Sequence, residues 1–168
     1  IPHEKDVDVL GERALGAFST DRNPVLPPAV ATVQHILEVA AFDATDKRVA
    51  VVGVGFLVGK PIATWFMRRC AELTVLYRGG DRSALGRADL VVAAVGEAGA
   101  LDPTALKPGA AVIDFGYRMV GGKLSGDLDT SNPNALERLA FYTPTPGGTG
   151  PILVAKLFEN FYCLSAHH

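Results

Sequence analysis

The chain has 168 residues and a formal net charge of −2. This balance gives no general attraction to a phosphate backbone or an anionic membrane, so neither nucleic acid nor a membrane is an expected partner. Cys70 and Cys163 are the two cysteines, without ligand spacing around them, which argues against a disulfide framework and a zinc site and favours a cytoplasmic location.

Residues 1–27 are interpreted as a lead-in segment before the first predicted helix, which covers 28–41. The Pro27-Pro28 pair is a usual signal for the start of a helix. Short apolar runs predict strands at 49–54, 73–77, 90–95 and 111–115. An amphipathic helix over 60–70 and shorter helical segments over 83–87 and 103–106 separate these strands.

The four predicted strands are apolar almost throughout and do not alternate with polar residues. Strands of this kind belong to parallel sheets whose two faces are both covered. The helical segments between them complete a repeated strand-helix order. The sequence therefore predicts an α/β fold, a Rossmann-like doubly wound parallel sheet with helices on both faces, in one domain over 1–168.

A glycine-rich turn, V-G-V-G-F-L-V-G-K-P at 52–61, follows the first predicted strand. Gly53 and Gly55 allow the backbone to approach a pyrophosphate, whose charge suits the N–H groups at the start of the next helix. The spacing to Gly59 is one residue longer than the common dinucleotide fingerprint, so purely steric glycines are the alternative. The position at the first strand-to-helix junction favours nucleotide binding.

The second predicted strand ends in L-Y-R-G-G-D-R at 76–82, where NAD-binding proteins carry an acidic residue for the ribose hydroxyls. Arg78 stands there, with Arg82 close behind, and an arginine suits the additional phosphate of NADP. Asp81 is the argument for NAD, and a solvated basic loop is the alternative interpretation. The sequence thus favours NADP over NAD.

The helix predicted over 151–164 is apolar around most of its circumference. Its polar residues, Lys156, Glu159, Asn160 and Cys163, form a narrow stripe. The large apolar residues are Leu153, Val154, Leu157, Phe158, Phe161 and Leu164. One face of a sheet cannot cover so much apolar surface, so we expect a second contact elsewhere.

Five segments resemble, in order and spacing, the bifunctional methylenetetrahydrofolate dehydrogenase/methenyltetrahydrofolate cyclohydrolase family. They are E-K-D-V-D at 4–8, V-G-K-P at 58–61, K-P-G-A-A-V-I-D at 107–114, G-D-L-D at 126–129 and T-P-T-P-G-G-T-G-P at 143–151. The last segment is the most specific, because its prolines and glycines impose a rigid turn.

The resemblance implies that the chain is the C-terminal NAD(P)-binding domain of such an enzyme. In that family a nicotinamide cofactor oxidises methylene-tetrahydrofolate to the methenyl form, and water then opens this to formyl-tetrahydrofolate. The resemblance places Asp8 on the folate side as a catalytic residue. The implied cofactor-binding residues are Gly53, Val54, Gly55, Gly79 and Tyr117, to which the glycine turn adds Gly59 and the end of the second strand adds Arg78. The implied substrate-loop residues are Pro144, Pro146, Gly147 and Gly148.

The chain also departs from the family. The family often has G-R-S or G-A-S where residues 53–55 read G-V-G, so two side chains that could hold a cofactor phosphate are missing. Val9 replaces the glycine that usually follows Asp8, and P-V-L-P at 24–27 replaces P-C-T-P. The family's tyrosine-x-x-x-lysine pair, which lies in an N-terminal catalytic domain, has no counterpart here.

Three further expectations follow from this resemblance. The helix over 151–165 packs on an N-terminal catalytic domain, the nucleotide domains pair as a homodimer, and the 168-residue chain alone has no activity. A non-catalytic nucleotide-binding or regulatory module of the same fold is the alternative function.

Other acidic residues are interpreted as structural. Asp114 ends a predicted strand and is expected to cap the next turn, and Asp127 and Asp129 are expected in turns. Asp6 and Asp8 alternate and could form a pair of carboxylates, but they have no third oxygen ligand or histidine, so no metal is expected.

Overall fold

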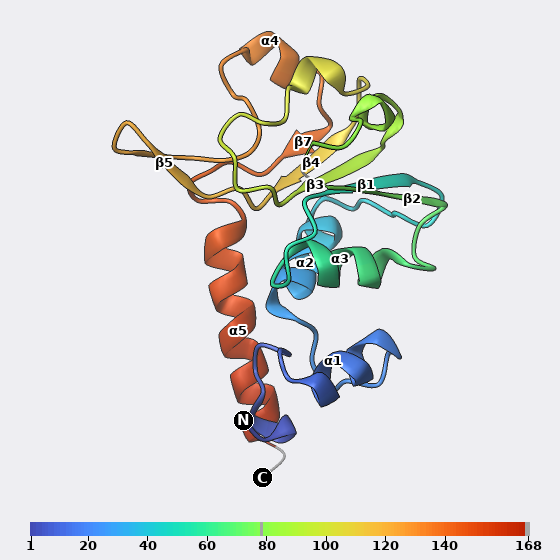
Figure 1. Cartoon of the computed structure of the whole chain (residues 1–168), viewed down its shortest axis with the longest axis vertical. Coiled ribbons are helices and arrows are strands. Elements are labelled where there is room, and N and C mark those ends of the chain that lie inside the picture. The colour runs from blue at the N-terminus through green and yellow to red at the C-terminus, as the bar shows by residue number, and fades with distance from the viewer. Residues whose placement is uncertain (78, 167–168) are drawn as a thin grey trace.

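The computed structural model describes residues 1–77 and 79–166. A five-stranded sheet lies at its centre, in the order β2-β1-β3-β4-β7, and every pairing in it is parallel (Figure 1). The strands are β1 (Arg48–Val52), β2 (Glu72–Leu76), β3 (Leu90–Ala93), β4 (Ala111–Asp114) and β7 (Phe141–Tyr142). After β2 the chain crosses to the opposite side of β1, so the strand order reverses between β1 and β3.

Helical segments cover both faces of this sheet. On one face lie α2 (Pro28–Val39) and α3 (Gly59–Phe66), and on the other lie η2 (Ser83–Arg87), η3 (Pro103–Ala105) and α4 (Pro133–Leu136) (Figure 1). Successive strand residues enter opposite cores: Val49 and Val51 pack with α2 and α3, and Ala50 and Val52 pack with the other layer. The predicted doubly wound α/β fold is confirmed.

Helix α3 is shorter than the predicted 60–70 segment and ends at Phe66, so the expectation that Cys70 is helical was wrong. Two local features account for this end. Arg68 adopts a left-handed conformation with φ 69°. The Arg69 guanidinium donates a hydrogen bond to the Trp65 carbonyl (2.8 Å), and such a contact satisfies an acceptor at a helix C-terminus.

Several short elements were not predicted. They are η1 (His3–Lys5), α1 (Glu12–Ser19), α4, β7 and a hairpin of β5 (Arg118–Val120) and β6 (Lys123–Ser125). The hairpin turns through Gly121 and Gly122, whose φ values of 57° and 80° suit a tight two-residue turn. It projects away from the sheet (Figure 1).

The lead-in segment is a packed part of the molecule. The Asp6 carboxylate accepts hydrogen bonds from the N–H groups of Leu10 (3.1 Å) and Gly11 (2.7 Å), which orders the entry to α1. The lead-in lies beside the far end of α5 (Thr149–Ser165), the long helix that runs away from the sheet (Figure 1). There the Asn160 amide donates to the carbonyls of Val7 and Leu26, at 2.8 Å each.

Candidate cofactor and substrate site

The glycines of the turn after β1 differ in what surrounds them. Gly53 has φ +87°, and a Cβ added there would lie 2.4 Å from the Ala94 carbonyl oxygen. A Cβ at Gly59 would lie 1.7 Å from the Gly53 carbonyl oxygen. Gly55 is exposed, and a Cβ there would meet nothing within 4 Å. Gly53 and Gly59 are therefore required by protein packing, and Gly55 leaves open space above the turn.

This turn lies where the strand order reverses. The turn from Gly53 follows the carboxyl end of β1, and the loop 94–97 follows the carboxyl end of β3, its neighbour on the reversed side. The close approach of Gly53 to Ala94 shows that these two loops touch. In doubly wound sheets, ligands bind in the crevice at this switch point.

A pocket of about 410 Å³ lies beside the turn, and all four predicted substrate-loop residues line it. It is lined by Val58, which precedes α3, by residues 115–117 after β4, and by the loop 144–151 with Leu153. Tyr117 is largely exposed at the edge of this pocket. The structure thus brings together Tyr117 and the proline-glycine loop, which are 27 residues or more apart in the sequence.

Three threonines fasten that loop to the end of β4. The Asp114 N–H donates to Thr143 Oγ1 (2.8 Å), and Thr149 Oγ1 donates to the Asp114 carbonyl (2.9 Å). Thr145 Oγ1 contacts the Gly116 carbonyl at 3.4 Å. The alternating T-P-T-P pattern therefore places hydroxyls against β4 while its prolines line the pocket. Sequence reasoning had singled out the prolines and glycines and missed these threonines.

Two charged residues of the loop after β2, Asp81 and Arg82, form hydrogen bonds within the protein. The Asp81 carboxylate accepts hydrogen bonds from the N–H and the hydroxyl of Ser83, both at 2.8 Å, which lower the pKa of Asp81. Arg82 donates to the Ala100 carbonyl. Gly79 has φ +78°, with open space around it. The predicted cofactor residue Arg78 lies outside the described residues.

Asp8 is not brought into the pocket. Its neighbour Val7 contacts Asn160, which is eleven residues after the first residue of α5 and hence roughly 16 Å along the helix from the proline-glycine loop. Partial burial, and then the charge of Asp6, raise the pKa of Asp8. Asp8 and the proline-glycine loop, both predicted on the substrate side, therefore lie at opposite ends of α5.

Two buried aspartates join the loops around the pocket. Asp114 and Asp127 are 2% and 1% exposed. Asp114 accepts hydrogen bonds from backbone N–H groups of residues 116, 127 and 128, and Asp127 accepts them from residues 95, 96 and 97. The structural interpretation of Asp114 is confirmed. Asp127 does more than occupy a turn, because its carboxylate holds a loop from another part of the chain.

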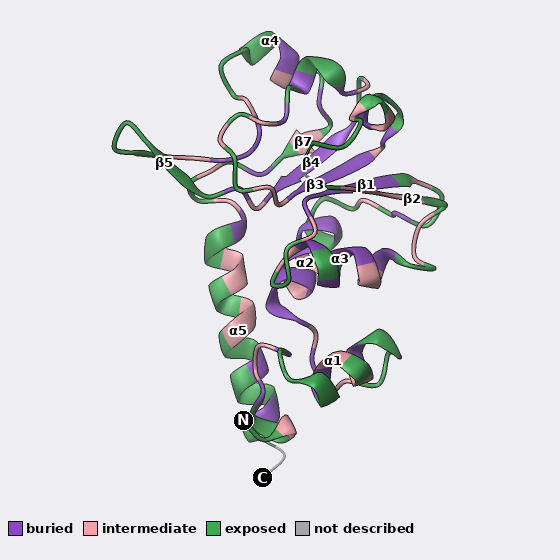
Figure 2. Ribbon diagram, in the orientation of Figure 1, coloured by how far each residue is buried: buried purple, intermediate pink, exposed green. Residues whose placement is uncertain are grey.

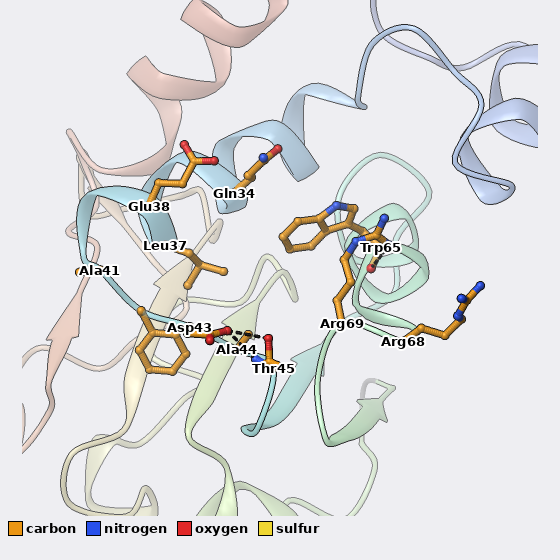
Figure 3. Close-up of a pocket in the computed structure, with 11 residues that line it drawn as sticks. Gln34, Leu37, Glu38, Ala41, Asp43, Ala44, Thr45, Trp65, Arg68 and Arg69 are labelled. Carbon is orange, nitrogen blue, oxygen red and sulfur yellow. Dashed lines mark hydrogen bonds between the residues drawn. The ribbon is translucent and has the colours of Figure 1, made fainter.

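A larger pocket of about 530 Å³ lies elsewhere (Figure 3). It is lined by the end of α2, the residues before β1 and the residues after α3, which places it at the amino edge of the sheet. Arg69, which lines this pocket, has its guanidinium carbon 5.5 Å from the centre of the Trp65 ring and forms an ion pair with Asp21 (2.7 Å). This pocket is separate from the glycine turn.

Much of helix α5 is exposed to solvent (Figure 2). Val154, Phe158, Phe161 and Tyr162 are each more than half exposed. The predicted polar stripe was wrong in one respect, because Asn160 is buried and its amide binds the lead-in segment. Among the described residues, no helix could cross a membrane, and no group of three or more His, Cys, Asp or Glu side chains could hold a metal ion.

The fold and the switch-point turn define a doubly wound nucleotide-binding domain. Residues 27–168 match the family model described as the NAD(P)-binding domain of tetrahydrofolate dehydrogenase/cyclohydrolase, and the chain belongs to this family.

Curated relatives include bifunctional protein FolD 2 of Pseudomonas syringae pv. tomato, 38% identical over 162 residues, and bifunctional protein FolD of Geobacillus kaustophilus, 37% identical over 164 residues. These matches cover 93% and 95% of this chain but 53% and 57% of those proteins. The chain thus spans about half the length of the curated relatives it matches.

Solved structures of methylenetetrahydrofolate dehydrogenases are also similar to this chain. The methylenetetrahydrofolate dehydrogenase-cyclohydrolase of Trypanosoma brucei, determined with NADP cofactor and an inhibitor, superposes with a TM-score of 0.90 at 32% identity, covering 99% of this chain and 60% of that one. The NAD-dependent methylenetetrahydrofolate dehydrogenase of Saccharomyces cerevisiae superposes with a TM-score of 0.73 at 17% identity, over 98% of this chain and 62% of that one, which supports the fold alone.

Proposed function

We propose that this chain is the cofactor-binding domain of an enzyme that oxidises methylene-tetrahydrofolate to methenyl-tetrahydrofolate with NADP and hydrolyses the product to formyl-tetrahydrofolate. One observation carries the proposal. The turn that Gly53 and Gly59 pack tightly leaves the space above Gly55 open, beside a pocket lined by the proline-glycine loop. An open glycine at this junction suits the close approach of a pyrophosphate.

In this proposal, each part of the site has a separate task. The bound nicotinamide supplies the hydride acceptor. The turn at 53–55 and the start of α3 hold the pyrophosphate, Gly79 leaves room for the ribose, and the backbone at Tyr117 orients the nicotinamide amide. The loop with Pro144, Pro146, Gly147 and Gly148 lies between the nicotinamide and the folate.

Asp8 is proposed to bind the folate from the far end of α5. Partial burial and the charge of Asp6 raise the pKa of Asp8, and perturbed carboxylates of this kind are frequent at ligand sites. The lysine that transfers protons in this family has no counterpart in the chain, so an N-terminal domain is proposed to supply it. The exposed apolar side chains of α5 are proposed to pack on that domain.

The preference for NADP is supported by the loop after β2. The Asp81 carboxylate already orders its own loop by accepting hydrogen bonds from Ser83 at both oxygens, whereas NAD-binding proteins use an acidic residue to bind the ribose hydroxyls. Arg82 is engaged with Ala100, which leaves Arg78 as the arginine proposed to contact the 2′-phosphate. A homodimer remains a further prediction of the family resemblance, and a cytoplasmic location remains a prediction of the cysteine content.

Calorimetric titration of the chain with NADP and with NAD tests this function. We expect NADP to bind more tightly, and Arg78→Ala to weaken NADP about tenfold with little effect on NAD. Equal losses for both cofactors would contradict the role of Arg78, and no binding of either would contradict the proposed function. In single-turnover absorbance assays with methylene-tetrahydrofolate, the chain alone is expected to be inactive, and robust turnover would show that no further domain is needed.

A further inference from the structure

One carboxylate binds three consecutive residues of the loop that follows β3, residues 95–97. Asp127 accepts hydrogen bonds from the N–H groups of Val95 (2.6 Å), Gly96 (3.2 Å) and Glu97 (2.8 Å). Gly96 and Glu97 are exposed, so apolar packing contributes little to their order. Three backbone donors on one buried anion form strong, charge-assisted hydrogen bonds.

This loop lies next to the glycine turn at the switch point. It continues directly from Ala94, whose carbonyl oxygen lies 2.4 Å from the place of an added Cβ on Gly53. A displacement of 95–97 would therefore move the backbone that faces the glycine turn. Asp127 belongs to neither the turn nor the pocket, and its hydrogen bonds reach the turn through the backbone of 95–97.

The position of Asp127 is itself fixed from β4. The Asp114 carboxylate accepts hydrogen bonds from the N–H groups of Asp127 (3.1 Å) and Leu128 (2.9 Å). Glycine is required on both sides of this pair: a Cβ at Gly116 would lie 2.2 Å from the Asp127 nitrogen, and one at Gly126 would lie 2.1 Å from Asp114 Oδ2. Because Thr143 and Thr149 bind the Asp114 backbone, the same pair reaches the proline-glycine loop.

We propose that Asp127 is a positioning residue for the cofactor, which sets the loop 95–97 against the glycine turn and couples it to the proline-glycine loop through Asp114. The proposal rests on the proposed function in that the ligand positioned is NADP. It does not make Asp127 a catalytic residue, since the carboxylate is buried and occupied by backbone donors.

The test compares Asp127→Asn with Asp129→Asn. Asp129 lies two residues away and caps an exposed turn at Ser131 (2.9 Å), so it controls for loss of a carboxylate in this segment. An asparagine at 127 keeps the size of the side chain but turns an N–H group toward the backbone donors. We expect hydrogen exchange at 95–97 to quicken at least tenfold in Asp127→Asn and NADP affinity to fall about tenfold, with neither change in Asp129→Asn.

Leu139→Ala separates positioning from a general loss of stability. Leu139 is buried in the apolar core on the sheet face covered by η2, η3 and α4. Its truncation therefore lowers the melting temperature without removing a hydrogen bond of the loop 95–97. At a temperature where all variants are folded, Leu139→Ala should bind NADP like the wild type. If it loses as much affinity as Asp127→Asn, or if Asp127→Asn binds NADP normally, the proposal is wrong.

Two further outcomes are decisive. If the wild type binds neither NADP nor NAD, the proposed function fails, and exchange at 95–97 still decides whether Asp127 orders this loop. If Asp127→Asn does not fold, the wild type alone provides the test: its amides at 95–97 should exchange as slowly as those of β3. Exchange as rapid as in the exposed turn at 121–122 would overturn the proposal.

Discussion

Replacing Gly53 and Gly55 separately by alanine distinguishes a packing glycine from a ligand-contacting glycine. At Gly53, φ is +87° and the added Cβ would lie 2.4 Å from backbone oxygen, which cannot move as a flexible side chain could. A left-handed conformation costs about 1–2 kcal/mol for a residue with a Cβ, and overpacking about 1–3 kcal/mol more. Gly53→Ala should therefore lower the free energy of unfolding by roughly 2–5 kcal/mol.

The opposite result is expected at Gly55. Among the described residues, and apart from its chain neighbours, no atom lies within 4 Å of its added Cβ, so Gly55→Ala should change the free energy of unfolding by less than about 0.5 kcal/mol. The same methyl group would occupy the space through which a pyrophosphate approaches the backbone, so affinity for NADP should fall at least about tenfold. Urea denaturation and calorimetric titration measure the two effects. Normal NADP binding by a stable Gly55→Ala variant would refute the placement of the phosphate.

Three other predictions concern the lead-in segment and α5. The raised pKa of Asp8 means that the folded state binds its proton more tightly than the unfolded state, so stability falls as pH rises from the unfolded value of 3.8 through the folded one. Asp8→Asn should melt higher than the wild type at about pH 7 but not below about pH 3, and equal melting at neutral pH would count against this. Asn160→Ala removes two hydrogen bonds of 2.8 Å and should cost about 1–3 kcal/mol in denaturation, with faster exchange at 7–10; unchanged exchange there would contradict it. Phe158→Glu/Phe161→Glu should abolish any self-association seen by light scattering, whereas a wild type that is already monomeric, with α5 fully protected from exchange, would argue against a second interface.

The sheet could be predicted from the sequence because its strands are buried on both faces. Each of the four predicted strands begins at or within one residue of the observed one. The fifth strand, β7, was missed because its two residues, Phe141 and Tyr142, are too few to show a pattern. The hairpin β5–β6 was missed because three-residue strands with exposed side chains carry no apolar run. The strands could be predicted because burial requires continuous apolar runs, and not because of strand propensity.

Side-chain tasks were less predictable wherever they depend on a distant backbone. Asn160 falls within a polar stripe on a helical projection, yet its amide satisfies two carbonyls of the lead-in segment. Asp127 looks like a turn residue in G-D-L-D, yet its partners lie some thirty residues earlier. Local patterns indicate that such groups need partners and do not say which ones.

The glycines show most clearly how much a sequence motif can predict. At Gly53 and Gly59, other backbone atoms lie too close to leave room for a Cβ. At Gly116 and Gly126, two buried carboxylates and the backbone that they bind lie too close. Gly55 is the member of the turn whose surroundings are empty. Protein packing explains the first four completely, so their spacing alone is no evidence for a ligand. Within this turn, Gly55 is the glycine whose substitution can decide where the cofactor phosphate binds, because protein packing does not require a glycine there.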